Sequence, residues 1–278
     1  MKEVSVVTGA LGALGRPIAA ELARRGRLVV LVGRTEERLE RARWEIASSC
    51  SLSAIETLAC DLASIASVQA AASALARRHP RIDTLVHCAA TFTATRRTSR
   101  DGHELMVATN HLAPYLLTRL LEGPLVAARD ARIVCMTMPS TKPPALDDLM
   151  SERRFFALEV FAMSKAMNQY FVRELAARWG SAASVFAVNP TVTRTTLVRE
   201  APLPLRIAIA VCGASPEDSI ESTIHAATSP SLAGRTGLYF GAEPKETFMP
   251  ASADERARAL LWERSAELVG LARVGAAS

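Results

Sequence analysis

Cysteine pairs at metal-binding or redox spacing are missing from this sequence. Its cysteines are odd in number and no CxxC pair occurs. They are Cys50, Cys60, Cys88, Cys135 and Cys212. We therefore predict no disulfide framework and no metal site, but free thiols of the kind found in the reducing cytoplasm. A strand-like run at residues 4–7 stands where a signal peptide would have its apolar segment, which again favours a cytoplasmic protein.

Long apolar runs and clusters of basic residues are missing as well. The longest apolar stretch, residues 203–214, carries Pro204 and Arg206 and is too short to cross a bilayer, so we predict no membrane partner. The net charge of +5 comes mostly from arginines scattered along helical segments. No basic run with interleaved aromatic residues occurs, so we predict no nucleic-acid partner. A basic surface of this kind suits an anionic small molecule.

Short β-branched runs alternate with longer helical segments along the chain. Candidate strands lie at residues 3–8, 28–32, 55–59, 84–88, 132–136, 184–188 and 237–240, and candidate helices at 13–25, 36–48, 65–78, 103–121, 156–179 and 253–271. This alternation predicts an α/β fold, a doubly wound parallel sheet (the Rossmann fold) with helices on both faces. We expect one domain over residues 1–278, with proline-rich loops at 139–149 and 191–204 overhanging the ligand crevice.

A glycine-rich turn joins the first strand to the first helix. Residues 8–15 read TGALGALG, which puts Gly9, Gly12 and Gly15 at GxxGxxG spacing. Glycines allow a tight turn and close backbone approach, and the helix N-terminus offers free N–H groups to a pyrophosphate. Such a turn alone is weak evidence, but between the first strand and helix of a βαβ unit it predicts a dinucleotide site.

Two arginines favour NADP over NAD as the cofactor. The second strand ends in Val32-Gly33-Arg34, without the acidic residue that binds the ribose 2′-hydroxyl in NAD sites. Arg34 and Arg16 can bind a 2′-phosphate instead; the alternative is that both are ordinary surface arginines. Asp61, after the third strand, is a candidate for the adenine edge, with a helix N-cap as the alternative.

Several further motifs, taken in order, resemble the short-chain dehydrogenase/reductase family, in particular its retinol-dehydrogenase-like branch. DGHE at residues 101–104 and NHLAPYLLT at 110–118 are similar to the branch's fourth-helix signature. DDL at 147–149, SK at 164–165 and RELA at 173–176 are similar to the segment around its active-site helix, and ATSP at 227–230 with GLYF at 237–240 resembles its C-terminal part. The resemblance covers nearly the whole chain. It implies a small-molecule oxidoreductase that forms a homo-oligomer through its long fourth and fifth helices.

The resemblance also implies roles for individual residues. The glycine turn, including Leu14, would cradle the pyrophosphate. Lys165 would hold the hydroxyls of the nicotinamide ribose, Asn110 would order a water or backbone group behind the active site, and Thr195 would meet the nicotinamide carboxamide. Ala89 and Pro190 lie where the family has its Asn-Asn-Ala-Gly and Pro-Gly motifs, and are expected to line the same site.

The departures from the family concentrate on the chemistry. Its Tyr-x-x-x-Lys motif reads Phe161-Ala162-Met163-Ser164-Lys165 here. In the family the lysine lowers the pKa of the tyrosine from about 10, so that the phenol acts as general acid or base, whereas Phe161 has no proton to give. The serine that polarises the carbonyl corresponds to Met138, whose thioether is no donor. The candidate catalytic set is therefore Lys165, Asn110, Phe161 and Met138.

No other residue is an obvious replacement for the tyrosine. Tyr170 lies nine residues further along the same helix, and His87 is expected to be a buried histidine at a strand end. Thr137 and Ser140 could replace the missing serine only after a rearrangement of the loop. Lys165 stays open as a proton donor beside its ribose role.

Three hypotheses for function follow. Loss of both groups suppresses ordinary ketone reduction, since one acid/base group typically supplies ~10²–10⁴-fold in rate. The first hypothesis is therefore hydride transfer from NADP(H) to an activated hydrophobic substrate, such as a quinone, an imine or an enone, which needs no proton from the enzyme. The second hypothesis is a non-redox cyclase, dehydratase or isomerase in an apolar pocket. The third is a catalytically silent nucleotide-binding protein.

Overall fold

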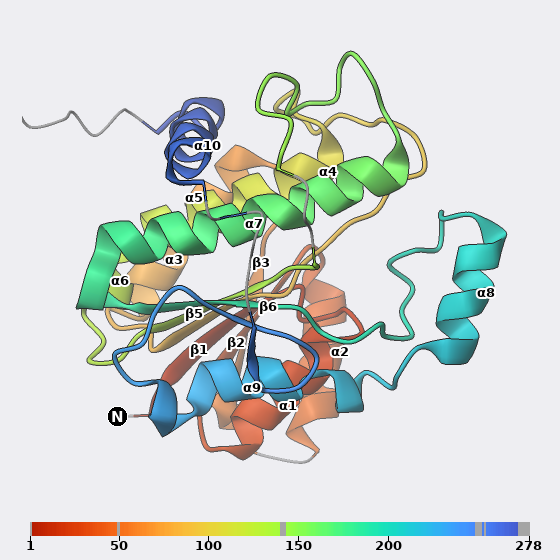
Figure 1. Cartoon of the computed structure of the whole chain (residues 1–278). Helices are drawn as coiled ribbons and strands as arrows, with labels where there is room; N and C mark the ends of the chain where they lie inside the picture. Colours follow the sequence, from red (N-terminus) through yellow and green to blue (C-terminus); the bar gives the residue numbers. More distant parts are fainter. Residues whose placement is uncertain (1, 49–50, 140–142, 248–251, 253, 272–278) are drawn as a thin grey trace, which may run out of the picture.

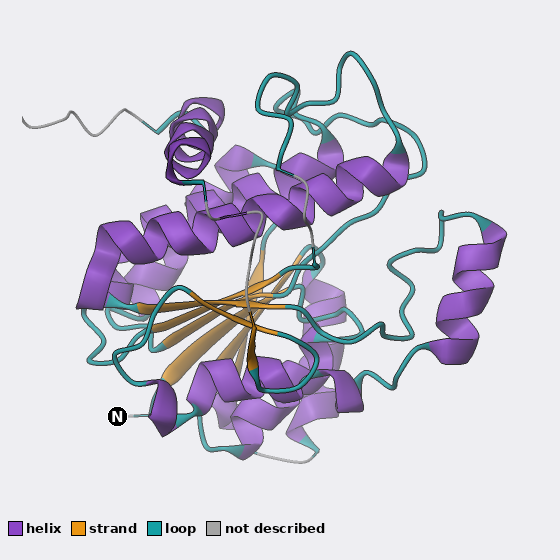
Figure 2. Cartoon of the chain, viewed as in Figure 1, coloured by secondary structure: helices purple, strands orange, loops and turns teal. Residues whose placement is uncertain are grey.

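An eight-stranded sheet forms the middle layer of the molecule, between two layers of helices (Figures 1 and 2). This computed structural model describes residues 2–48, 51–139, 143–247, 252 and 254–271. The strands are β1 (Val4–Thr8), β2 (Leu28–Gly33), β3 (Ile55–Ala59), β4 (Thr84–His87), β5 (Arg132–Met136), β6 (Ser184–Val188), β7 (Leu238–Phe240) and β8 (Glu246–Thr247). Their order is β3-β2-β1-β4-β5-β6-β7-β8, and only the β7–β8 pair is antiparallel within the described ranges. The predicted doubly wound fold is confirmed.

The helices divide between the two faces of the sheet. One face carries α1 (Gly15–Arg24), α2 (Glu36–Ala47) and α9 (Glu221–Thr228), and the other α3 (Ile65–Arg78), α5 (Ala113–Leu120) and α7 (Ala157–Trp179). The smaller helical elements are α4 (Leu105–Val107), the π-helical turn η2 (Ala108–Leu112), α6 (Glu122–Val126), α8 (Leu203–Cys212), α10 (Glu255–Leu268) and the 3₁₀ turns η1 (Leu52–Ala54), η3 (Gly180–Ala182), η4 (Glu217–Ser219) and η5 (Pro230–Leu232).

Two hydrophobic cores lie on the two faces of the sheet. In β1, Val6 packs into the core with α3, α5 and α7, while Val7 packs into the core with α1, α2 and α9. Every residue of β1, β5 and β6 is buried, because a sheet covered on both faces needs side chains that avoid water on both. The strand order reverses between β1 and β4, so the carboxyl ends of these two strands border the crevice in which ligands of such folds bind.

The structure divides one predicted helix and adds others. Residues 103–121 form α4, the π turn η2 and α5 in succession rather than a continuous α-helix. The segment 191–202 is irregular as predicted, but α8 follows at Leu203, and α8, α9 and β8 had no counterpart among the predicted elements. Part of the predicted loop at 139–149 lies outside the described residues.

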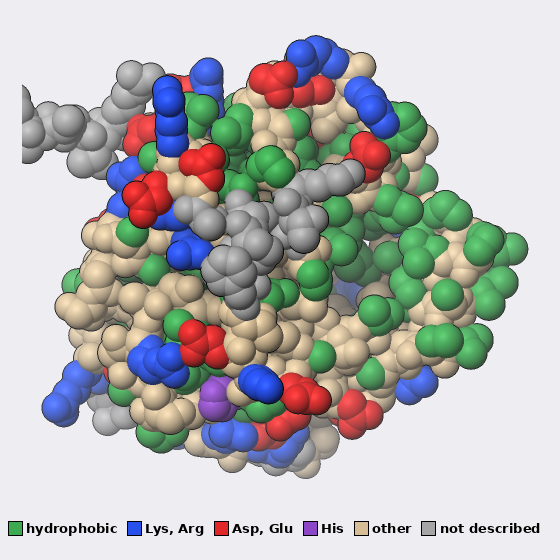
Figure 3. Space-filling view, in the orientation of Figure 1, with side chains coloured by type: hydrophobic (Ala, Val, Ile, Leu, Met, Phe, Trp, Pro, Cys, Tyr) green, Lys and Arg blue, Asp and Glu red, His purple; other side chains and the backbone are tan. Residues whose placement is uncertain are grey.

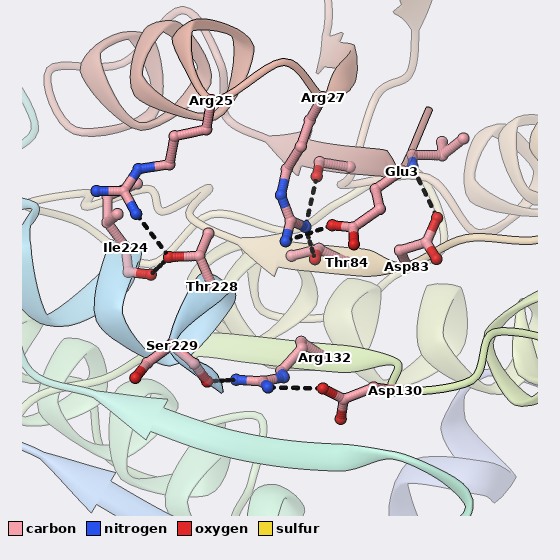
Figure 4. Close-up of polar contacts among 12 residues, drawn as sticks. Glu3, Arg25, Arg27, Asp83, Thr84, Asp130, Arg132, Ile224, Thr228 and Ser229 are labelled. Atoms are coloured by element: carbon pink, nitrogen blue, oxygen red, sulfur yellow. Dashed lines mark hydrogen bonds and ion pairs between the residues drawn. The ribbon is translucent and has the colours of Figure 1, made fainter. Parts of the chain in front are cut away.

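Arginines tie together the amino ends of the central strands (Figure 4). Arg27, after α1, donates to the Thr84 hydroxyl at 2.7 Å and pairs with Glu3 at 2.6 Å, and burial lowers its guanidinium pKa. Arg132 of β5 donates to the Ser229 carbonyl oxygen at 2.9 Å and pairs with Asp130 at 2.7 Å. This end of the sheet is thus held by charge-assisted contacts, and the opposite end is left for the crevice.

The last helix, α10, packs across α5 and α7. The Trp262 ring lies 5.0 Å from the Tyr115 ring and 6.1 Å from the Phe171 ring. The guanidinium groups of Arg119 and Arg178 lie 4.8 and 4.6 Å from the centre of the indole. Aromatic packing and cation–π contacts therefore fix α10 on the two helices through which the predicted homo-oligomer would form.

The described residues contain neither a candidate membrane-spanning helix nor a candidate metal site. None of the helices there combines the length and the apolar character needed to cross a membrane. No group of three or more His, Cys, Asp or Glu side chains within the described ranges could hold a metal ion.

Candidate active site

The glycine turn is fixed by backbone contacts that leave no room for a side chain. Gly9 has a φ of +67°, and a Cβ there would lie 2.6 Å from the Ala89 Cα atom. A Cβ on Gly15 would lie 2.2 Å from the Gly9 carbonyl oxygen, to which the Gly12 N–H donates at 2.8 Å. The Thr8 hydroxyl joins this turn to the neighbouring strand β4 and the loop after it, since it donates to the Val86 carbonyl oxygen and accepts from the Ala89 N–H.

The N-terminus of α1 is open at this turn. The helix begins at Gly15, its N-cap residue Leu14 makes no side-chain capping bond, and its first turn carries no acidic residue. In this turn the Arg16 N–H already donates to the Gly12 carbonyl oxygen and Pro17 has no N–H. What the turn offers a ligand is the positive end of the helix dipole, at the point where the strand order reverses, without a competing carboxylate of the same helix. This arrangement can bind a phosphate group.

The two arginines predicted to select NADP differ in their surroundings. Arg34 follows β2, is exposed, and makes no hydrogen bond or ion pair with any of the described residues. Arg16 is paired with Glu45 of α2 at 2.5 Å, and both side chains are about half exposed. Arg34 is thus available to a ligand as it stands, whereas Arg16 must leave or share its carboxylate.

Asp61 lies in a turn after β3. Its carboxylate accepts from the Ala63 N–H at 3.1 Å, and its own N–H donates to the Ser67 hydroxyl. The N-cap of α3 is Ser64, not Asp61. The helix-cap alternative for Asp61 is therefore wrong, and a contact to the adenine edge stays a prediction.

Asn110 connects three elements behind the crevice. It lies in the π turn η2 and is fully buried. Its side-chain amide accepts from the Thr91 N–H at 2.7 Å and donates to the Thr91 carbonyl oxygen at 3.0 Å and to the Ser164 hydroxyl at 2.9 Å. Asn110 therefore fixes the backbone of the loop after β4 against α7, and with it the segment that faces the glycine turn.

A directed chain of hydrogen bonds reaches Asn110 from α10. The Asn168 amide donates to the Asn110 carbonyl oxygen at 2.8 Å, so its own oxygen must accept from Nδ1–H of His111, 3.3 Å away. Burial lowers the His111 pKa to about 4, so the imidazole is neutral and its Nε2 is an acceptor. The Ser265 hydroxyl lies 2.8 Å from both this Nε2 and the Leu261 carbonyl oxygen, so its single proton is shared between two acceptors.

Lys165 is a buried cation without an acidic partner. It is 5% exposed, and its ammonium group makes no hydrogen bond or ion pair with the described residues. Burial lowers its pKa to about 8, opposed only weakly by the nearby thiols of Cys88 and Cys135. The Thr137 hydroxyl donates to the Lys165 carbonyl oxygen at 2.7 Å and fixes its backbone. A buried ammonium in this state calls for a ligand that supplies acceptors.

Phe161 and Met138 put apolar side chains at two of the positions predicted to take part in catalysis. The Phe161 ring packs edge-on against Phe92, with 5.7 Å between ring centres. Met138 follows β5 and is half buried, and its carbonyl oxygen accepts from the Gln169 side chain. Ser140, one of the two candidates to replace the serine, lies outside the described residues. The other, Thr137, uses its hydroxyl on Lys165.

His87 and the tyrosines are part of the packed interior. Burial lowers the His87 pKa to about 3, and its Nε2 lies 2.8 Å from the Thr118 hydroxyl. The three tyrosines are buried among the described residues; they are Tyr115, Tyr170 and Tyr239. None of these groups combines exposure to the crevice with a pKa suited to proton exchange at neutral pH.

The segment after β6 forms the other side of the crevice. Pro190 is half buried at the strand end, and the Thr195 hydroxyl accepts from the Leu197 N–H at 3.1 Å. Glu200 accepts from the Ala94 N–H at 3.2 Å and forms two contacts with Arg97, at 3.0 and 3.3 Å. These hydrogen bonds and the ion pair therefore connect the loop after β4 to the loop after β6.

Several of these contacts had no signal in the sequence. The contacts of Asn168, of Ser265 and of the Arg97–Glu200 ion pair join residues that are far apart in the chain. In the sequence, each of these residues is an ordinary polar residue with nothing to mark its partner. Thr8 is the exception. A hydroxyl directly before a glycine turn, at the end of a buried strand, could have been proposed as a link between neighbouring strands.

Comparison with known proteins gives the class and then the family. The fold and its switch-point turn define a Rossmann-type protein. A family model described as short chain dehydrogenase matches residues 3–204. Retinol dehydrogenase 14 of Homo sapiens is 33% identical over 96% of this chain and 86% of its own length. The chain therefore belongs to the short chain dehydrogenase family, and the predicted resemblance to its retinol-dehydrogenase-like members is confirmed at this level.

Solved structures agree on the fold. A crystal structure of a protein from Mycobacterium paratuberculosis superposes with a TM-score of 0.75 at 26% identity, covering 96% of this chain and 93% of that one. A short chain dehydrogenase from Escherichia coli, complexed with NADPH, superposes with a TM-score of 0.70 at 22% identity, covering 87% of this chain and 97% of that one.

Proposed function

We propose that the protein binds NADP(H) and reduces an activated, small hydrophobic substrate of the quinone, imine or enone type. The observation that carries the proposal is Lys165, a buried ammonium without an acidic partner, on the same crevice as an uncapped helix behind a glycine turn. A buried ammonium without acceptors and an uncapped helix N-terminus both raise the free energy of the folded protein. A dinucleotide would supply ribose hydroxyls to the first and phosphate oxygens to the second.

The residues present fit such a cofactor. Gly9, Gly12, Leu14 and Gly15 would let the pyrophosphate approach the backbone at the positive end of the α1 dipole, and Arg34 would bind the 2′-phosphate with Arg16 beside it. Lys165 would hold the nicotinamide ribose. Ala89, Pro190, Thr195 and Asp61 would line the remainder, and the chemistry that the cofactor supplies when bound is hydride transfer.

The reaction side of the site supports a substrate that needs little help with protons. Phe161 and Met138 exclude water and orient an apolar substrate, but neither donates a hydrogen bond. Lys165, with a pKa of about 8, is the remaining group near the reacting atoms that can release a proton near neutral pH. Asn110 holds the loop after β4 in place. Substrates whose reduced form is stable as an anion, or which carry their own positive charge, suit this set.

Titration with NADPH and NADH tests the proposal. We expect NADPH to bind at least about tenfold more tightly, because a bidentate guanidinium–phosphate contact is worth more than 1.4 kcal/mol. Arg34→Ala should remove the preference without weakening NADH. Arg38→Ala, an exposed arginine on α2, is the matched control. Failure to bind either nucleotide would overturn the proposal.

A second function is favoured by the apolar surface of Phe161, Phe92 and Met138. Such a surface can fold a hydrophobic substrate for a cyclisation, dehydration or isomerisation without redox chemistry. The two functions differ in one measurement. Oxidation of NADPH in step with product formation supports the first, and turnover that continues after the nucleotide has been removed supports the second.

A further inference from the structure

Helix α8 is apolar except for Arg206 and yet exposed. Its sequence is LPLRIAIAVC, and none of its ten residues is buried. Leu203, Ile207 and Val211, spaced four residues apart on one face, are 60%, 54% and 73% exposed. In Figure 1 the helix stands away from the body, linked to it by the irregular segments on either side. A helix of this composition is normally covered by protein or by lipid.

A second apolar segment lies across the crevice from α8. Nine large hydrophobic side chains are exposed in the described part of the chain, and six of them belong to the start of α7 and to residues 192–211. These six are Phe156, Leu158, Val192, Leu203, Ile207 and Val211. Figure 3 shows apolar side chains on both walls of a hollow between α8 and the body. The exposed apolar surface is thus concentrated around the mouth of the site, not scattered as single residues.

The charges on the α8 segment are almost all positive. Residues 190–214 contain three arginines, all exposed, and one acid, Glu200, which is taken up by Arg97. The arginines are Arg194, Arg199 and Arg206, and none of them forms an ion pair with the described residues. The apolar side chains are therefore accompanied by cations without partners, which are complementary to a surface that is both apolar and anionic.

We propose that α8 and the start of α7 dock on the surface of a membrane that contains anionic lipids. Leu203, Ile207 and Val211 would enter the acyl boundary, and the arginines would contact the headgroups. This differs from spanning, for which a helix of ten residues is too short. A second copy of the chain is a poorer occupant, because two α8 helices face to face would bring like charges together.

Docking in this position would open the crevice directly to the bilayer. The hollow beside α8 would then face the bilayer, so an apolar compound dissolved in the membrane could enter it without crossing water. The docking itself is independent of the reaction. The substrate class that it implies, a membrane-dissolved compound, rests on the proposed reductase function.

Co-flotation of the purified full chain with vesicles tests the docking. The vesicles would contain phosphatidylcholine and phosphatidylglycerol in a three-to-one ratio, against phosphatidylcholine alone. We expect flotation with the anionic vesicles, a loss of several-fold without phosphatidylglycerol, and a further loss as salt screens the arginines.

Matched variants separate α8 from the rest of the surface. Ile207→Asp should weaken vesicle binding at least about tenfold, because it puts a carboxylate at the centre of the apolar face. Val126→Asp, at a similarly exposed valine on α6, should leave it unchanged. Arg199→Gln with Arg206→Gln should weaken binding to anionic vesicles, whereas Arg38→Gln with Arg129→Gln should not. All four positions are exposed, and thermal unfolding verifies that each variant is folded.

Three outcomes would overturn the docking proposal. The first is no flotation with either vesicle. The second is flotation that Ile207→Asp and Val126→Asp reduce equally. The third is a dimer in light scattering without lipid that Ile207→Asp dissociates, which would make a second copy the occupant. Because no step of the assay uses a nucleotide, a failure of NADPH binding leaves its result intact.

Discussion

The two sides of the crevice are specified in different ways. At the glycine turn, backbone contacts at Gly9 and Gly15 exclude any larger residue. On the reaction side, the main chains of Phe161 and Met138 are held by side chains, because Ser164 donates to the Phe161 carbonyl oxygen and Gln169 to that of Met138. A site fixed through backbone atoms tolerates little change, whereas a side chain held by its main chain can change its chemistry without loss of the fold.

The largest effect is expected at the glycine turn. In Gly15→Ala the new Cβ meets the Gly9 carbonyl oxygen, a backbone atom that cannot yield, so the turn must open. We expect NADPH affinity to fall more than about a hundredfold and the free energy of unfolding by ~3 kcal/mol or more. Calorimetric titration and thermal unfolding measure both. Gly123→Ala, where a Cβ meets nothing, is the control; an equal effect there would contradict the comparison.

On the reaction side, substitutions that add hydroxyl groups should increase ketone reduction without loss of the fold. Phe161→Tyr combined with Met138→Ser would add a phenol and a hydroxyl at the two positions proposed to lack them, so NADPH-dependent reduction of a simple ketone should rise by ~10²–10⁴-fold. The measurement is the rate of NADPH oxidation with a panel of ketones. Phe161→Leu is the control that changes the ring without adding a hydroxyl. If the double variant binds NADPH but gains nothing, the two sides are less independent than proposed.

Lys165 links the two sides, and its burial predicts a pH dependence of stability. Its pKa is about 8 in the folded chain and 10.5 in the reference state. Between these values the unfolded state binds more protons, so the free energy of unfolding rises with pH, by on the order of 3 kcal/mol in total. Lys165→Met should remove this rise, stabilise the protein at neutral pH and weaken NADPH binding. Denaturant unfolding from neutral pH to the top of that window measures the first two effects.

The smallest effect is expected at the far end of the chain of hydrogen bonds. Ser265→Ala removes the donor to His111 and should cost ~1–2 kcal/mol of stability, with a slight loss of NADPH affinity through Asn110. Ser231→Ala, at an exposed serine, should cost nothing measurable. The proton assignment has its own measurement. A nitrogen NMR spectrum should place the His111 proton on Nδ1, and a proton on Nε2 would contradict the direction of the chain.

The sequence predicted the parts of the molecule that local patterns determine. Runs of β-branched residues indicate the buried strands, and the glycines at residues 8–15 indicate the turn. The fold and the glycine-turn side of the crevice could therefore be predicted from the sequence. The contact of Asn168 with Asn110 spans 58 residues and that of Arg97 with Glu200 spans 103, and no local pattern encodes either. Helix α8 was missed because apolar residues fill nearly every position of 203–212, so no polar face contrasts with an apolar one in the sequence.

The docking of α10 has a consequence for the order in which the protein is made. Ser265 is synthesised well after the strands β1 to β6. Its hydroxyl is nevertheless the first group in the series of hydrogen bonds that runs through His111 and Asn168 to Asn110. A growing chain can therefore complete most of its sheet on the ribosome while the support behind the crevice is still missing. That support requires α10, whose Trp262 ring packs against Tyr115 and Phe171.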